Sequence, residues 1–230
     1  MTRTLTFLIV FCYLYTAKAQ VKDSLITPNK INAYILPTSL VVGGITLNAL
    51  KKEKPLKFFK SVPSTIDYMH YSTAALGILA PISGITSKNS LIDRSIYLSA
   101  GFLLSSAITL PLKKTMSVLR PDGSDSKSFP SGHATTAFAM AQWLREEYKA
   151  CNPLLSYSGY FIATASSISR VSYHKHHLAD VLMGAGIGML STKAIYAIFP
   201  NGFSKSKNKH ITLYPISSKE TYGLTMAIVF

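Results

Sequence analysis

The chain has 230 residues, a mean hydropathy of +0.24 and a formal net charge of +14. Its length suffices for one substantial domain, and its 48% of hydrophobic residues is high for a soluble protein but low for one made only of membrane spans. The positive charge fits an anionic membrane or an anionic substrate. Nucleic acid is not an expected partner, because no patch interleaves basic and aromatic residues.

The N-terminus has the pattern of a secretory signal peptide. Arg3 precedes a short apolar run over residues 5–14, and Ala17, Lys18 and Ala19 fit a cleavage site. The run is about ten residues long, whereas crossing a bilayer takes about 20. We therefore expect a signal peptide over residues 1–19 and export to the cell envelope. After cleavage one cysteine, Cys151, remains, which excludes an intramolecular disulfide.

Six apolar segments predict an all-α fold, a six-helix bundle within a domain over residues 20–203. We expect Pro37 to break the first helix, and the fourth to end in a solvated terminus at residues 145–148. Gly184 and Gly188 lie four residues apart on one helix face, which allows close helix packing. The predicted helices span residues 31–50, 66–83, 91–112, 132–148, 154–172 and 177–199.

The C-terminal tail, residues 204–230, has a different character. Residues 204–209 form a basic linker, and residues 211–216 and 222–230 have the pattern of two short strands. An isolated hairpin is marginally stable, so we expect this one to pack on the bundle or on a partner.

Three polar blocks interrupt the helices and carry the residues suited to chemistry. Lys113, Arg120 and Arg170 are cations that fit phosphate oxygens, arginine as a planar fork and lysine as a point charge. We expect Lys113 in a turn-rich loop over residues 113–132. Ser131 can cap the helix that begins at Gly132, where backbone amides favour an anion. Together these residues predict a cradle for a tetrahedral oxyanion, and for the transition state of its transfer.

Two histidines are the candidates for the nucleophile and the general acid. His176 and Asp180 are four residues apart, so the carboxylate can hold one ring N–H and leave the other nitrogen as the nucleophile. His133 is the expected general acid that protonates the leaving oxygen. Because the three cations neutralise the phosphoryl charge, neither a metal nor another cofactor is expected. A metal cluster of His174, His176 and His177 is the alternative interpretation of this region, without a set of carboxylates to support it.

The three blocks resemble the signature of the type 2 phosphatidic acid phosphatase and vanadium haloperoxidase superfamily. That signature is K-x6-RP, then PSGH, then SR-x5-H-x3-D, and the sequence matches it at every position and every spacing within a block. The resemblance implies an all-helical bundle with the site at one end and the roles assigned above. The matching residues are Lys113, Arg120, Pro121, Pro130, Ser131, Gly132, His133, Ser169, Arg170, His176 and Asp180.

Within this family we expect a phosphatase of an envelope lipid, because apolar helices surround a basic site. It would be associated with a membrane and face the periplasm, as an integral or a peripheral protein of open oligomeric state. The alternatives are a broad-specificity periplasmic acid phosphatase acting on small phosphoesters, a vanadate-dependent haloperoxidase and a catalytically inactive relative. Haloperoxidases are generally much longer chains, and an inactive relative would be expected to have lost at least one signature residue.

Overall fold

The computed structural model describes residues 28–50, 68–203, 211–218 and 221–228. It divides into two units, Met1–Leu36 and Pro37–Phe230, with the boundary inside helix α2 (Pro28–Leu50). The predicted signal peptide and the basic segment over residues 51–60 lie outside the described residues. α2 continues through Pro37, so the predicted break at this proline is wrong.

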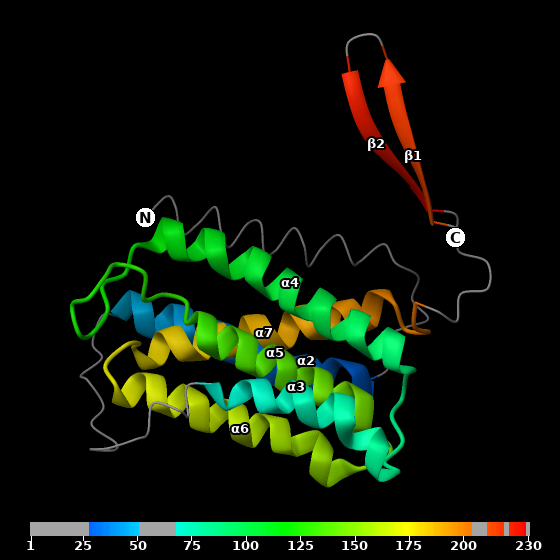
Figure 1. Cartoon of the computed structure of the whole chain (residues 1–230). Coiled ribbons are helices and arrows are strands. Elements are labelled where there is room, and N and C mark those ends of the chain that lie inside the picture. The colour runs from blue at the N-terminus through cyan, green and yellow to red at the C-terminus, as the bar shows by residue number, and fades with distance from the viewer. Residues whose placement is uncertain (1–27, 51–67, 204–210, 219–220, 229–230) are drawn as a thin grey trace. The chain divides into compact units, whose positions relative to one another are not determined.

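Each of the six predicted helical segments contains an α-helix, which confirms the all-α class (Figure 1). The second predicted helix, over residues 66–83, begins later than expected in its α-helical part and ends in a 3-10 turn, η3 (Ala80–Ser83). After α2 the helices are α3 (His70–Leu79), α4 (Leu91–Met116), α5 (Gly132–Tyr148), α6 (Pro153–Ser172) and α7 (Leu178–Ile198).

Helix α5 is the central helix and packs against α3, α4, α6 and α7 (Figure 1). Its buried residues include many alanines, which let neighbouring helices come close. Helix α7 comes closest where Gly184 and Gly188 face α5, as the spacing of the two glycines predicted. A Cβ atom on Gly188 would lie 2.2 Å from the carbonyl oxygen of Thr135, and one on Gly184 would lie 2.5 Å from that of Ser131. Neither position has room for a side chain.

Pro81 explains how α3 ends. Proline has no N–H, so it cannot donate the helical hydrogen bond to the carbonyl of Gly77 four residues earlier. The hydroxyl of Tyr148 donates to that carbonyl instead, at 2.5 Å. The chain then leaves the helix through Gly84, whose φ of +80° is a conformation that glycine adopts without strain.

The C-terminal end of α5 is buried, so the predicted solvated terminus is wrong. Glu147 is 0% exposed and accepts hydrogen bonds from Asn89 Nδ2 at 2.8 Å, from Asn89 N at 3.1 Å and from the hydroxyl of Tyr196. Arg94 donates to the hydroxyl of Tyr148 at 3.0 Å. We call these five residues the Glu147 cluster: Asn89, Arg94, Glu147, Tyr148 and Tyr196. The partners come from distant parts of the chain, so the local pattern of residues 145–148 does not reveal them.

Among the described residues, three helices are long and apolar enough to cross a membrane: Asn32–Leu50, Leu91–Met116 and Leu178–Ile198. Large apolar side chains are also exposed on α6, among them Leu154 and Phe161. Isolated exposed apolar residues are normal, but whole helices of this kind support association with a membrane.

The backbone of the tail forms two antiparallel strands, β1 (Ile211–Ser218) and β2 (Thr221–Ile228), with Ile211 opposite Ile228. The expectation that this hairpin packs on the bundle or on a partner stays a prediction.

Candidate active site

Lys113 lies in the last turn of α4, not in a loop as predicted. The helix continues to Met116 and ends at Ser117, which adopts a left-handed conformation with φ +43°. The ammonium group of Lys113 donates to the carbonyl of Lys127 at 2.8 Å, which connects the end of α4 to the loop before α5. A helix therefore positions the first predicted cation.

Hydrogen bonds join the loop that carries Arg120 to the corner between α6 and α7. Arg120 Nη1 donates to the carbonyl oxygen of Lys175 at 3.3 Å, and the ammonium of Lys175 lies 2.6 Å from the Asp122 carboxylate. The amide of Asp122 donates to the carbonyl of His174 at 3.0 Å. The first and third sequence blocks are thus held side by side.

The turn before α5 is held against the start of α7. The amide of Ser131 donates to the backbone carbonyl of Asp180 at 2.9 Å. The side chain of Ser131 caps α5, as predicted, by accepting from the amide of Ala134 at 3.4 Å. Since the first turn of a helix presents N–H groups without helical acceptors, Gly132 lies where backbone amides can bind an anion.

His176 and Asp180 form a buried pair, 2% and 0% exposed in their side chains, with His176 Nδ1 3.4 Å from Asp180 Oδ2. That carboxylate oxygen also accepts from the amide of His177 at 2.7 Å and from the hydroxyl of Ser128. His176 Nδ1 and Asp180 Oδ1 are both buried without a hydrogen-bond partner in the described part of the chain.

Burial lowers the pKa of His176 below the ordinary value of 6.5. Contact with Asp180 opposes this shift, whereas the positive charges of Lys113 and Arg120 add to it. The imidazole therefore stays neutral, and so nucleophilic, to a lower pH than that of an exposed histidine.

Positive charge converges on this pair. Lys113 interacts electrostatically with Arg120 and Arg170, and also with the carboxylates of Asp180 and Asp125. Arg120 is itself paired with Asp125, at 2.7 Å from Nε to Oδ1. The backbone carbonyl of Arg170 accepts from the amide of His176 at 3.3 Å, which keeps the end of α6 next to the buried histidine. Together these residues form a region in which cations outnumber carboxylates, and such a region is suited to binding a multiply charged anion.

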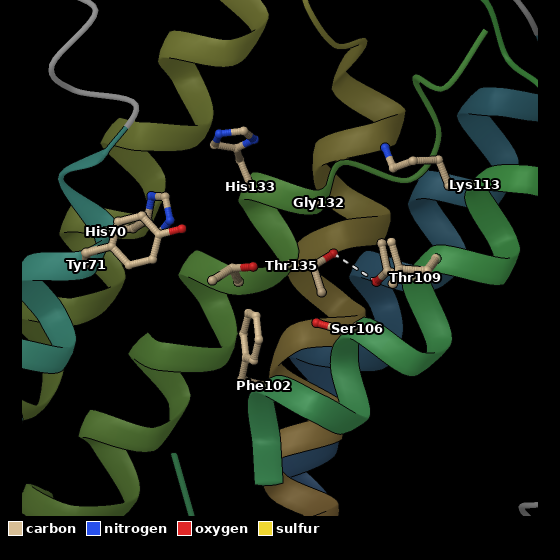
Figure 2. A pocket seen from close by; sticks show the side chains of 11 residues that line it. His70, Tyr71, Phe102, Ser106, Thr109, Lys113, Gly132, His133 and Thr135 are labelled. Carbon is tan, nitrogen blue, oxygen red and sulfur yellow. Dashed lines mark hydrogen bonds between the residues drawn. The ribbon is translucent and has the colours of Figure 1, made fainter. Parts of the chain in front are cut away.

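His133 lies in the first turn of α5 and lines a cleft of about 220 Å³ between α3, α4 and α5 (Figure 2). The neighbouring wall is formed by His70, which is 1% exposed and whose ring centroid lies 5.9 Å from that of His133 in an edge-to-face arrangement. The sequence interpretation missed His70, because this residue belongs to none of the three blocks. The one feature of the sequence that could have pointed to His70 is that a histidine stands within an apolar helical segment. The remaining lining residues are Tyr71, Phe102, Ser106, Thr109, Leu110, Lys113, Gly132, Thr135 and Thr136.

The neighbouring histidines do not form a metal site with His176. His177 directs its Nε2 to the carbonyl of Leu119, at 3.2 Å, whereas His176 faces Asp180. Within the described residues no group of three or more His, Cys, Asp or Glu side chains is placed to hold a metal ion.

The matching family model covers the segments that bring these residues together. Residues 94–204 match the model of the PAP2 superfamily. This segment, just under half of the chain, is thus similar to the PAP2 superfamily. The match includes all three sequence blocks and four of the described helices, from α4 to α7.

The chain is similar to lipid A 1-phosphatase of Porphyromonas gingivalis, with 46% identity over 72 residues. That match covers 31% of this chain and 16% of the relative, so the chain spans well under two thirds of its length.

Two solved structures are also similar. The crystal structure of Aquifex aeolicus LpxE has a TM-score of 0.43 and 21% identity, covering 60% of this chain and 88% of the other. The transmembrane PAP2 type phosphatidylglycerolphosphate phosphatase from Bacillus subtilis has a TM-score of 0.42 and 18% identity, covering 90% and 99%. At these TM-scores neither likeness carries an argument about this chain.

Proposed function

We propose that this chain is a PAP2 superfamily phosphatase that hydrolyses a phosphate ester of an envelope lipid, without a metal, through a phosphohistidine at His176. The observation that supports this most is the convergence of Lys113, Arg120 and Arg170 on the buried pair of His176 and Asp180. Such a constellation supplies a nucleophile, its orienting carboxylate and a cationic cradle for phosphoryl oxygens.

In the first step, Nε2 of His176 attacks phosphorus while the ester P–O bond breaks. Asp180 holds the proton of Nδ1 and stabilises the positive charge that develops on the ring. His133 gives its proton to the departing oxygen, so that the product leaves as an alcohol. The three cations and the amides at the start of α5 stabilise the negative charge on the equatorial oxygens.

In the second step, water attacks the phosphohistidine and the P–N bond breaks. His133, now neutral, accepts the proton from the attacking water and returns to its starting state. Inorganic phosphate and neutral His176 are released, which closes the cycle without a net change in the protein.

A lipid is the proposed substrate because the site lies in a chain with three helices able to cross a membrane. The name of the relative with 46% identity, lipid A 1-phosphatase, supports the same substrate class. A predicted signal peptide over residues 1–19 supports export, so we place the site on the periplasmic side. N-terminal sequencing of the protein isolated from envelopes tests this last point, because an intact Met1 contradicts it.

The function is tested by phosphate release from phosphorylated envelope lipids and from water-soluble phosphomonoesters, with EDTA present and His176→Ala as the blank. We expect release from lipids and an acid-labile phosphorylated form of the wild type on rapid quenching. Equal release from soluble esters would instead indicate a broad-specificity acid phosphatase. No release from any compound would contradict the phosphatase proposal, and halide oxidation with added vanadate would then be measured.

A further inference from the structure

The cleft beside His133 lies on one side of the reaction centre. Both His133 and Lys113 line it, whereas His176 and Asp180 are not among its lining residues. In a displacement at phosphorus, the attacking and departing groups lie roughly in line on opposite sides. If His176 attacks and His133 protonates the departing oxygen, the leaving group lies on the side of His133. The cleft is therefore where the leaving group must be accommodated.

The inner part of this cleft carries hydroxyl groups. Figure 2 shows Ser106 and Thr109 on α4 across from Thr135 on α5. The hydroxyl of Thr109 donates a hydrogen bond to the hydroxyl of Thr135, at 3.3 Å between the two oxygens. Within the described structure, by contrast, Ser106 and Thr136 donate to no protein acceptor.

This difference is informative because serine and threonine inside a helix often bond back to a carbonyl one turn earlier. On the same helix α4, Ser95 donates to the carbonyl of Leu91 at 2.8 Å and Ser105 to that of Phe102 at 2.9 Å. Neither Ser99 nor Ser106 makes such a bond in the described structure, but only the side chain of Ser106 lines the cleft. Its hydroxyl is available to a ligand.

Apolar side chains form another part of the lining. Phe102 and Leu110 from α4 and Tyr71 from α3 are 40%, 57% and 54% exposed. A cleft with exposed apolar walls and available hydroxyls fits a group that is itself amphipathic. It fits an all-hydrocarbon alcohol poorly, because burying these hydroxyls without partners costs free energy.

We infer that this cleft binds the leaving group of the substrate, and that Ser106 and Thr136 recognise a hydroxyl close to the ester oxygen, as in a sugar or glycerol phosphate of a lipid. The inference rests on the proposed function and adds to it the chemical class of the alcohol. Sites built to hydrogen-bond a substrate hydroxyl reject the analogue that lacks it, since their own polar groups are then left unpaired.

The test uses the purified full chain in detergent micelles and two probes that differ by one hydroxyl. One probe is a 1-acylglycerol 3-phosphate, and the other is its analogue with propanediol in place of glycerol. We expect wild-type kcat/KM to favour the glycerol probe by about tenfold, the effect of one or two neutral hydrogen bonds. In Ser106→Ala and in Thr136→Val the ratio should fall to about threefold or less.

Ser99→Ala is the matched control, because Ser99 is an exposed serine of the same helix that does not line the cleft. The ratio of the two probes is measured on one preparation, so partial misfolding of a variant does not change it. Hydrolysis of both probes without a preference, or a preference that survives both substitutions, would overturn the inference and leave the proposed function intact. Hydrolysis of neither probe nor of any soluble ester would overturn both.

Discussion

The two ends of α5 use charged residues in opposite ways. At the C-terminal end, Glu147 is fully buried, and each of its oxygens accepts from groups of the protein itself. At the N-terminal end, Lys113 and Arg120 act electrostatically on His176, and Lys113 also interacts with Arg170, so that cations outnumber carboxylates. One end is saturated with internal partners, whereas the other keeps an excess of positive charge that an anion can neutralise.

This contrast shows that burial of a charge does not identify its role. Glu147 and Asp180 are equally inaccessible at 0% exposure, yet the first connects helices and the second lies against a candidate nucleophile. What separates them is the neighbourhood, since Asn89 and Tyr196 are neutral donors whereas His176 is titratable. Substitutions at the two ends should therefore affect different measurements.

The largest effect is expected at the N-terminal end, in His176→Ala. Loss of the nucleophile should reduce kcat by about four orders of magnitude or more. The variant should remain folded in detergent with a lower thermal unfolding midpoint, because the buried carboxylate of Asp180 loses its imidazole partner. A variant that retains substantial turnover would show that His176 is not the nucleophile.

His133→Ala should distinguish the leaving-group side from the nucleophile side of the same end. A general acid contributes about 10²- to 10⁴-fold when the leaving group is a poor one. We expect a penalty of about 10³-fold on an alkyl phosphate and a much smaller one on p-nitrophenyl phosphate, whose phenolate leaves without protonation. Equal penalties on both esters would argue against the acid role.

At the opposite end, Glu147→Leu should change stability rather than chemistry. Asn89 and Tyr196 would lose their buried acceptor, which should lower the free energy of unfolding by about 3 kcal/mol or more. The kcat per folded molecule should be unchanged, which chemical denaturation and active-site titration can check together. A loss of kcat without a loss of stability would show that the two ends are coupled.

The smallest effect concerns the pH profile. Burial and the nearby cations lower the pKa of His176, so the acid limb of kcat/KM should lie below pH 6.5, the ordinary value for histidine. Activity is lost as the pH falls through this pKa, because protonation removes the nucleophilic lone pair. Replacing Lys113 by Met removes one of the charges, so the limb should move to higher pH even though the rate falls. A limb that moves to lower pH would contradict this electrostatic account.

The same contrast explains what the sequence could predict. The signature blocks are local strings with fixed spacing, so residues such as His133 and His176 could be proposed as site residues from the sequence alone. The helices followed from apolar segments, apart from the last turn of α4, where Lys113 and Lys114 look like the start of a loop but continue the helix. The roles of His133 and His176 remain predictions until the variants are measured.

The Glu147 cluster and His70 could not be predicted, because each depends on partners that are distant in the sequence. Asn89 and Glu147 are 58 residues apart, and Ser166, whose hydroxyl lies 3.5 Å from Nδ1 of His70, is 96 residues from it. A run such as Arg145, Glu146 and Glu147 is usually solvated, and only the packing of α4 and α7 around α5 shows that Glu147 is not. Tertiary contacts, rather than composition, decide such cases.

Gly184 carries no functional group, yet it faces the carbonyl of Ser131 so closely that an added Cβ atom would lie 2.5 Å away. One turn earlier on the same helix, the backbone of Asp180 accepts from the amide of Ser131. The glycine thus acts as a spacer that sets the distance between the turn before α5 and Asp180, the buried partner of His176. Inactive variants need not have lost a charge or a nucleophile. Adding one methyl group at a position with no chemistry of its own is enough to misalign two groups that do have it.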